Sequence, residues 1–114
     1  MRTLFVTLLS FAFVSTCLAI IPPLDDLLRG DANNDGQVNF TDDVYIQNFL
    51  YSGGDMPPCL EAADVNDDGS IDLSDSVYLN SYLFLGGSAP PAPFPYCGQD
   101  PDPGSLTCDD SACP

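Results

Sequence analysis

The stretch Asp31-Ala-Asn-Asn-Asp-Gly-Gln-Val-Asn-Phe-Thr-Asp42 recurs 33 residues later as Asp64-Val-Asn-Asp-Asp-Gly-Ser-Ile-Asp-Leu-Ser-Asp75. In both copies, oxygen-bearing side chains occupy positions 1, 3, 5, 9 and 12, Gly occupies position 6, and an aliphatic residue occupies position 8. This is the spacing of an EF-hand calcium loop, with Asp instead of Glu at the last position. The repeat therefore predicts two Ca²⁺ ions, one in each loop.

Calcium is a hard cation that prefers several oxygen ligands, and a tight loop can direct positions 1, 3, 5 and 12 and the backbone carbonyl of position 7 at one point. The predicted ligands of the first loop are Asp31, Asn33, Asp35, Gln37 and Asp42, and those of the second are Asp64, Asn66, Asp68, Ser70 and Asp75. Residues rich in Asp, Asn and Gly also form turns without metal, which is the alternative interpretation. Two copies in the same register argue against it.

The two loops differ at position 9, which is Asn39 in the first and Asp72 in the second. Because ligand charge helps to set calcium affinity, we expect the second loop to bind more tightly. Val38 and Ile71, at position 8, should face away from the metal and pack together. Without metal, repulsion between the acids should leave the loops disordered.

Residues 1–19 have the pattern of a signal peptide: one basic residue, an apolar run, and small residues before a cleavage site after Ala19. A retained anchor and a lipid on Cys17 are the alternatives, although the apolar run is short for a membrane span. Cleavage removes Arg2 from a chain of formal net charge −15 and leaves −16. Such a chain is a poor partner for nucleic acid, because phosphate binding needs clustered Lys and Arg. We expect a secreted or extracytoplasmic protein.

Four cysteines remain after cleavage: Cys59, Cys97, Cys108 and Cys113. An even number in a short secreted chain predicts two disulfides, with three possible connectivities. A Cys59–Cys97 bridge would join the ends of the second repeat and leave Cys108–Cys113 as a small loop in the tail. A zinc site is the rival interpretation, but the chain has no His and no Cys-x-x-Cys pair.

The chain divides into a lead-in (20–30), a calcium-binding domain (31–96) with repeats at 31–58 and 64–91, and a tail (97–114) rich in Pro, Asp and Cys. Each loop should continue into a helix, at 42–51 and 75–85, which a Gly-Gly pair ends. No long helical pattern precedes either loop, and the tail should be irregular. The predicted fold is small and mainly α, with one EF-hand-like loop and one helix per repeat, stabilised by calcium and disulfides.

Both predicted helices carry more apolar side chains than one buried face requires. Examples are Phe49 and Tyr51 in the first and Phe84 and Leu85 in the second. The excess should either form an exposed patch that contacts a partner, or be covered by the lead-in leucines and the Pro-rich tail. The sequence leaves both alternatives open.

The duplicated loops, each followed by one helix, resemble a type I dockerin. More narrowly, the stretches 29–33, 62–69, 82–87 and 93–98 resemble the dockerin-type repeat proteins of planctomycete bacteria. Thrombospondin type 3 repeats share acidic calcium loops but lack a helix in each repeat, so the helical segments favour a dockerin.

The resemblance implies two calcium ions, two roughly antiparallel helices related by a pseudo-twofold axis, and binding to a cohesin module, often in extracellular polysaccharide degradation. It places the recognition pairs at loop positions 10 and 11, here Phe40 with Thr41 and Leu73 with Ser74. Position 10 is apolar here, where Ser is frequent in the family. From the resemblance and the signal-peptide pattern, we expect a secreted, calcium-binding docking module that binds another protein.

Two other functions compete with docking. A calcium buffer or structural secreted protein without a dedicated partner is the alternative to docking. An enzyme is not expected, because the acids are committed to the metal loops and no nucleophile–base pair is present.

Overall fold

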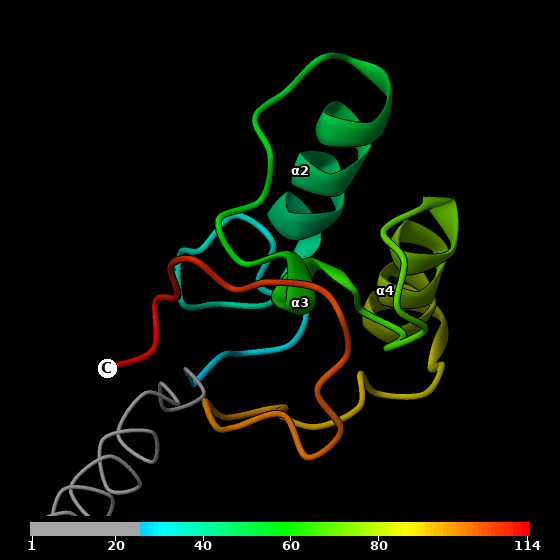
Figure 1. The fold of residues 1–114 in the computed structure, drawn as a ribbon. Coiled ribbons are helices and arrows are strands. Elements are labelled where there is room, and N and C mark those ends of the chain that lie inside the picture. Colours follow the sequence, from blue (N-terminus) through cyan, green and yellow to red (C-terminus); the bar gives the residue numbers. More distant parts are fainter. Residues whose placement is uncertain (1–25) are drawn as a thin grey trace, which may run out of the picture.

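The computed structural model describes residues 26–114, which contain three helices: α2 (Phe40–Tyr51), α3 (Leu60–Ala63) and α4 (Leu73–Leu85) (Figure 1). This part of the chain has no β-strand, only isolated bridges between Leu27 and Gly98 and between Cys59 and Cys108. The predicted mainly α class is confirmed. None of the described helices has the length and apolarity needed to cross a membrane. The predicted signal peptide lies outside the described residues.

Both long helices begin with a capping box. The Asn39 side chain accepts a hydrogen bond from Thr41 N, and the carboxylate of Asp42 accepts one from Asn39 N. Asp72 and Asp75 make the same pair of bonds at the start of α4. Loop position 9 is therefore the N-cap, and each helix begins two residues before the predicted starts at 42 and 75.

The predicted ends of both helices are confirmed. Gly86 follows α4 with φ 71°, a left-handed conformation that Gly adopts without steric cost. Gly54 N and Gly87 N donate back to Asn48 O and Ser81 O, each at 2.9 Å. A Cβ at either of these two glycines would lie about 3.0 Å from helix backbone, so a side chain at the second Gly of each pair would require the backbone to shift.

The main core lies between α2 and α4, which pack against each other (Figure 1). Its buried members come from both repeats and from the residue directly before the second: Ala32, Ile46, Ala63, Val65 and Leu79. Val38 and Ile71, the position 8 residues, pack against this core as partly buried side chains. The core therefore joins the two loops as well as the two helices.

The described end of the lead-in, residues 26–30, and the tail form a second, smaller packed region around α3. Leu27 and Gly98 exchange backbone hydrogen bonds of 2.8 and 3.0 Å, and Leu60 N donates to Thr107 O at 2.9 Å. Leu27 and Cys59 are buried here together with Ala62. Figure 1 shows the tail running across α3. As predicted, the tail contains no helix.

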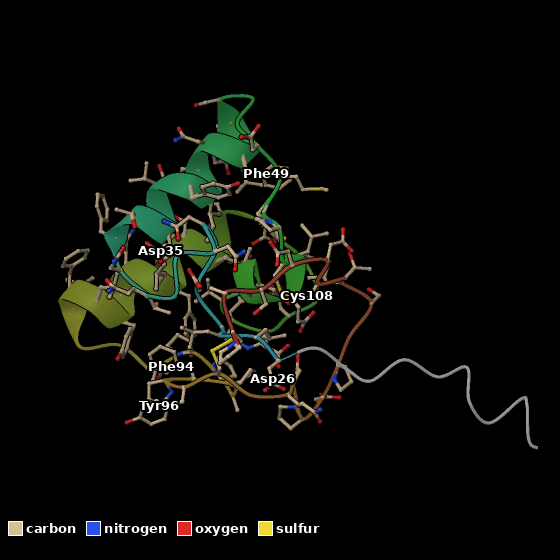
Figure 2. The ribbon with its side chains drawn as sticks, turned by 90° about the vertical axis from the view of Figure 1, so that its left-hand side faces the viewer. Asp26, Asp35, Phe49, Phe94, Tyr96 and Cys108 are labelled. Carbon is tan, nitrogen blue, oxygen red and sulfur yellow. A yellow bond between two sulfur atoms is a disulfide. The ribbon has the colours of Figure 1, made fainter. Side chains whose placement is uncertain are left out.

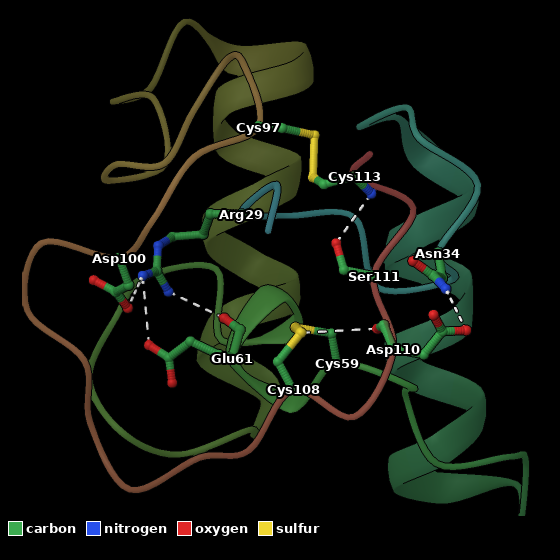
Figure 3. The surroundings of a disulfide bond; sticks show 10 residues. All are labelled: Arg29, Asn34, Cys59, Glu61, Cys97, Asp100, Cys108, Asp110, Ser111 and Cys113. Carbon is green, nitrogen blue, oxygen red and sulfur yellow. Dashed lines mark hydrogen bonds and ion pairs between the residues drawn. A yellow bond between two sulfur atoms is a disulfide. The ribbon is translucent and has the colours of Figure 1, made fainter. Parts of the chain in front are cut away.

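The structure forms two disulfides, Cys59–Cys108 and Cys97–Cys113 (Figure 3). Two bridges were expected with three connectivities open, and the pairing considered, Cys59–Cys97 with Cys108–Cys113, is not the one formed. The path of the tail explains the difference. Its backbone pairs with residues 58–60 around Cys108, whereas Cys97 lies next to the pairing of Gly98 with the lead-in.

The apolar excess on the helices is covered only in part. The ring of Phe94 in the tail makes an edge contact with Tyr82 of α4, with ring centroids 5.4 Å apart. Leu27 is buried against α3 and Cys59 and does not belong to the core between the long helices. Large apolar side chains on α2 and α4 stay exposed: Phe40, Val44, Tyr51, Leu73, Val77, Phe84 and Leu85. The tail therefore covers part of α4, and an apolar patch stays exposed; contact of this patch with a partner stays a prediction.

Candidate metal centre

The predicted acidic ligands come together in two separate groups. Asp31, Asp35 and Asp42 each contribute a carboxylate oxygen, and these oxygens lie within 4.8 Å of one another. The equivalent second group consists of Asp64, Asp68 and Asp75, and it meets the same limit. Hard cations such as Ca²⁺ prefer oxygen ligands clustered in this way.

The turn of each loop is held by the acid at position 1. The carboxylate of Asp31 accepts hydrogen bonds from Asp35 N at 3.1 Å and Gly36 N at 2.9 Å. In the second loop, Asp64 accepts from Asp68 N at 3.2 Å and Gly69 N at 2.8 Å. The two glycines have φ values of 84° and 87°. Positive φ here explains why position 6 is Gly in both copies.

The acid at position 12 joins the two ends of each loop. One oxygen of Asp42 accepts from Asn33 N at 3.2 Å and the other from Asn39 N at 2.8 Å. Asp75 makes the corresponding bonds with Asn66 N at 3.3 Å and Asp72 N at 2.9 Å. The same carboxylate therefore anchors the loop and begins the helix.

The remaining predicted ligands follow the same turn in both copies. The side-chain carbonyls of Asn33 and Asn66 accept from the amides of position 5, each at 3.2 Å. Gln37 N and Ser70 N donate to the position 5 carboxylates at 2.9 and 3.0 Å. Binding of the metal by these four residues stays a prediction.

The ligand groups hold carboxylates away from solvent. Asp31, Asp42, Asp64 and Asp75 are buried, whereas Asp35 and Asp68 are exposed at the outer side of each loop. Burial raises the pKa of Asp42 and of Asp75 to about 7, and repulsion from the neighbouring loop acids adds to it. Burial likewise raises the pKa of Asp31 and Asp64.

A cation would reverse this effect, because opposite charge favours the ionised carboxylate. Within residues 26–114, every ion pair involves Arg29, and none involves the six acids of the two groups. Clustered, buried carboxylates without a protein cation fit a divalent metal. All-oxygen ligands without Cys or His in these groups fit calcium.

Asp72 has another role besides the added charge that the sequence suggested. Its Oδ1 accepts from Ser74 N at 2.9 Å and also from the Ser74 hydroxyl, so it caps α4. It does not belong to the close carboxylate group of the second loop. Each group therefore contains three carboxylates, and Asp72 adds its charge from the helix cap.

The predicted recognition residues lie in the first helical turns beside the loops. Phe40 and Leu73 are each 51% exposed. Phe40 makes an edge contact with Phe84 of α4, with ring centroids 5.9 Å apart. An open hollow of about 590 Å³ lies along α4 and includes Leu73, Ser74 and Val77 in its lining.

Sequence reasoning missed two polar arrangements. Arg29 is fully buried beside Glu61 and Asp100. Asp43 of α2 accepts from the Ser76 hydroxyl of α4 and from Gln47 Nε2, linking the two helices. The composition held one signal for Arg29: besides Arg2 it is the only basic residue of the chain, against 17 acids.

The family model of the dockerin type I domain matches residues 29–84. This region of the chain belongs to the type I dockerin family. The match begins at Arg29 and includes both loops and nearly all of α4. No curated protein and no solved structure matches the chain. A dockerin domain is a calcium-dependent protein–protein docking module and not a catalytic one, and the two carboxylate groups of this dockerin agree with that role.

Proposed function

We propose that this protein is secreted and docks onto a cohesin-like protein through the first turns of α2 and α4, with one calcium ion in each loop as a structural requirement. The observation that carries the proposal is the matched exposure of Phe40 and Leu73. These two residues occupy the same loop position in the two repeats and are each 51% exposed. Each follows directly after a helix cap at the end of a calcium loop.

Calcium binding and docking are connected through the position 12 acids. Asp42 and Asp75 each join a loop to the first turn of a helix. An ion that holds these carboxylates in place would also hold Phe40 with Thr41, and Leu73 with Ser74. The binding surface would then be ordered only when the loops contain calcium.

The charge of the chain indicates the chemistry of the partner. The exposed part of α2 and α4 is uncharged, since their three acids, Asp42, Asp43 and Asp75, are buried. The chain has 17 acids, and its one base outside the signal segment is buried. We expect a partner with an apolar centre and basic side chains around it. Attachment to extracellular polysaccharide-degrading assemblies is part of the same proposal.

The test changes the two pairs singly and together. Phe40 and Thr41 become Asp in one variant, Leu73 and Ser74 in a second, and all four in a third. Because the repeats are alike, each single-pair variant should bind the cohesin-like partner with modest loss, and the four-site variant should not bind. Tyr96→Asp is the control, since Tyr96 is 81% exposed but lies in the segment after α4 (Figure 2).

Binding is measured by surface plasmon resonance against cohesin modules from the source organism, in calcium and in chelator. Chelator should abolish binding by the unchanged protein. Full binding by the four-site variant would overturn the proposed surface. If no protein partner binds while calcium still does, the protein is a calcium buffer or a structural protein instead.

A further inference from the structure

Arg29 uses its whole guanidinium group inside the protein. Nε donates to Ala92 O at 3.2 Å, and Nη1 donates to Glu61 O at 3.1 Å and Asp64 O at 2.9 Å. Nη2 donates to Asp100 Oδ2 at 2.7 Å and Glu61 Oε1 at 3.4 Å (Figure 3). The five N–H donors of the group therefore have five acceptors. Its side chain has no exposure to solvent.

One of these hydrogen bonds and a further ion pair reach the second calcium loop. Asp64, whose carbonyl accepts from Nη1, is the first residue of that loop. Asp67, at position 4, lies 3.5 Å from Nη2 and has a positive φ of 58°. The other contacts reach Ala92 and Asp100, which follow α4 and lie beyond the region of the family match. Arg29 thus connects the start of the second loop to the C-terminal part of the chain.

Within the described residues, the first loop has no equivalent buried side chain on its outer side, although Gly30 N, directly before it, donates to Ala62 O at 2.8 Å. The residue two positions before Asp64, which corresponds to Arg29, is Ala62. Position 4 of the first loop is Asn34, and its side chain donates to Asp110 at 3.4 Å in an exposed contact. The two loops are nearly identical inside and differ in what holds them from outside.

The charge of Arg29 cannot be what helps calcium, because a cation beside a calcium site repels the ion. Any benefit must come from the position of the loop. The guanidinium can fix the Asp64 carbonyl because Glu61 and Asp100 hold it from the other side. Burial and its contact with Asp100 raise the pKa of Glu61 to about 7, which agrees with several acids sharing one base.

We propose that Arg29 is a positioning residue for the second calcium loop, and that through it the calcium affinity of this loop, but not of the first, depends on the Asp100 carboxylate. The inference rests on the proposal that each loop holds one ion. It extends the functional unit beyond the loops and helices to a residue of the tail.

The test follows each loop separately in the full chain. The backbone amides of Gly36 and Gly69 donate to the position 1 acids of their own loops, so their NMR signals report calcium binding loop by loop. Arg29→Lys keeps the charge but replaces the planar fork by a single nitrogen. Asp100→Asn keeps the size of the side chain and removes the charge that holds the guanidinium. Asp102→Asn is the matched control. Asp102 is exposed, and its substitution removes an equal charge two residues away from Asp100.

Arg29→Lys and Asp100→Asn should each weaken calcium binding at the Gly69 loop roughly tenfold or more, the usual effect of losing a group that orients a metal ligand. Binding at the Gly36 loop should change by less than about twofold, and Asp102→Asn should leave both loops unchanged. If Arg29→Lys does not fold, the proposal is tested by the calcium affinity of the Gly69 loop in Asp100→Asn against that in Asp102→Asn.

Equal weakening of both loops would overturn the proposal, because it would indicate a general loss of stability. An unchanged Gly69 loop in Asp100→Asn would overturn it too. If the Gly69 signal of the unchanged protein does not respond to calcium, the two-ion proposal itself fails, and that result is distinct from the other two.

Discussion

The first and second calcium loops have nearly the same internal hydrogen bonds but different surroundings. From the position 1 acid to the position 12 acid, corresponding donor–acceptor distances differ by no more than 0.2 Å. Outside the loops, Arg29 and α3 support the second loop, whereas Asn34 of the first makes one exposed contact with the tail. Duplication therefore accounts for the ligand geometry, and later segments make the two sites unequal.

The two repeats also differ where α2 and α4 are in contact. Asp43 and Ser76 occupy corresponding positions in the two repeats, and the Ser76 hydroxyl donates to the buried Asp43 carboxylate. Gln47 Nε2 donates to both, at 3.0 and 3.1 Å. An acid in both places would put two like charges together in the core, so the pseudo-symmetric contact needs different residues.

Removal of calcium from both loops should have the largest effect on stability, because both loops lose their metal and the difference between them disappears. The buried acid pairs, Asp31 with Asp42 and Asp64 with Asp75, would lose the calcium charge that offsets the cost of their burial. A ligand about a thousandfold above its dissociation constant stabilises the folded state by about 4 kcal/mol per site, so two sites account for most of the stability of a small domain. Circular dichroism should show most of the helical signal lost in chelator and restored by calcium.

Magnesium is the control for this experiment. It requires a tighter octahedral shell than these loops are expected to provide, so it should restore the signal poorly. An unchanged spectrum in chelator would contradict the role assigned to calcium.

Removal of one ligand from one loop should separate the two sites. Asp35→Ala and Asp68→Ala remove equivalent exposed acids, and each should lower the calcium stoichiometry towards one, at a cost of about 4 kcal/mol in excess calcium. Asp68→Ala should cost more, because the second loop also has the charge of Asp72 and the support of Arg29. Titration calorimetry and urea unfolding measure both quantities, and equal losses would refute the ranking.

Removal of one disulfide should have a smaller effect that again differs between the two regions. Cys59–Cys108 joins α3, before the second loop, to the tail, and its cysteines are 49 residues apart. Cys97–Cys113 spans 16 residues and ends next to Ala112, whose Cβ approaches the turn of the first loop at Gly36.

The Cys59–Cys108 disulfide closes the longer chain segment and therefore restricts the unfolded chain more. Cys59→Ser with Cys108→Ser should lower the free energy of unfolding by about 1 kcal/mol more than Cys97→Ser with Cys113→Ser. Urea unfolding in excess calcium measures the two double variants against the unchanged protein. The reverse order would show that strain or residual unfolded structure outweighs loop length.

The sequence predicted those features that depend on short spacing. The loops, the order of the acids and the ends of the helices at Gly-Gly follow from residues only a few positions apart. The helix starts were placed too late, because Asn39 and Asp72 were assigned to the loops alone, whereas they also cap the helices.

The features that were missed depend on the path of the tail. The partners of Arg29 are 32 to 71 residues away in the chain. The disulfide pairing depends on which part of the tail lies against α3. Neither follows from a local pattern, since long-range backbone contacts decide both.

We propose that each of the two loops holds one calcium ion. Native mass spectrometry of the oxidised protein in calcium counts bound ions directly, and the double variant Asp35→Ala with Asp68→Ala gives the background from non-specific binding to an acidic chain. We predict two ions above this background for the unchanged protein and one for each single variant. One ion or none for the unchanged protein would contradict the claim.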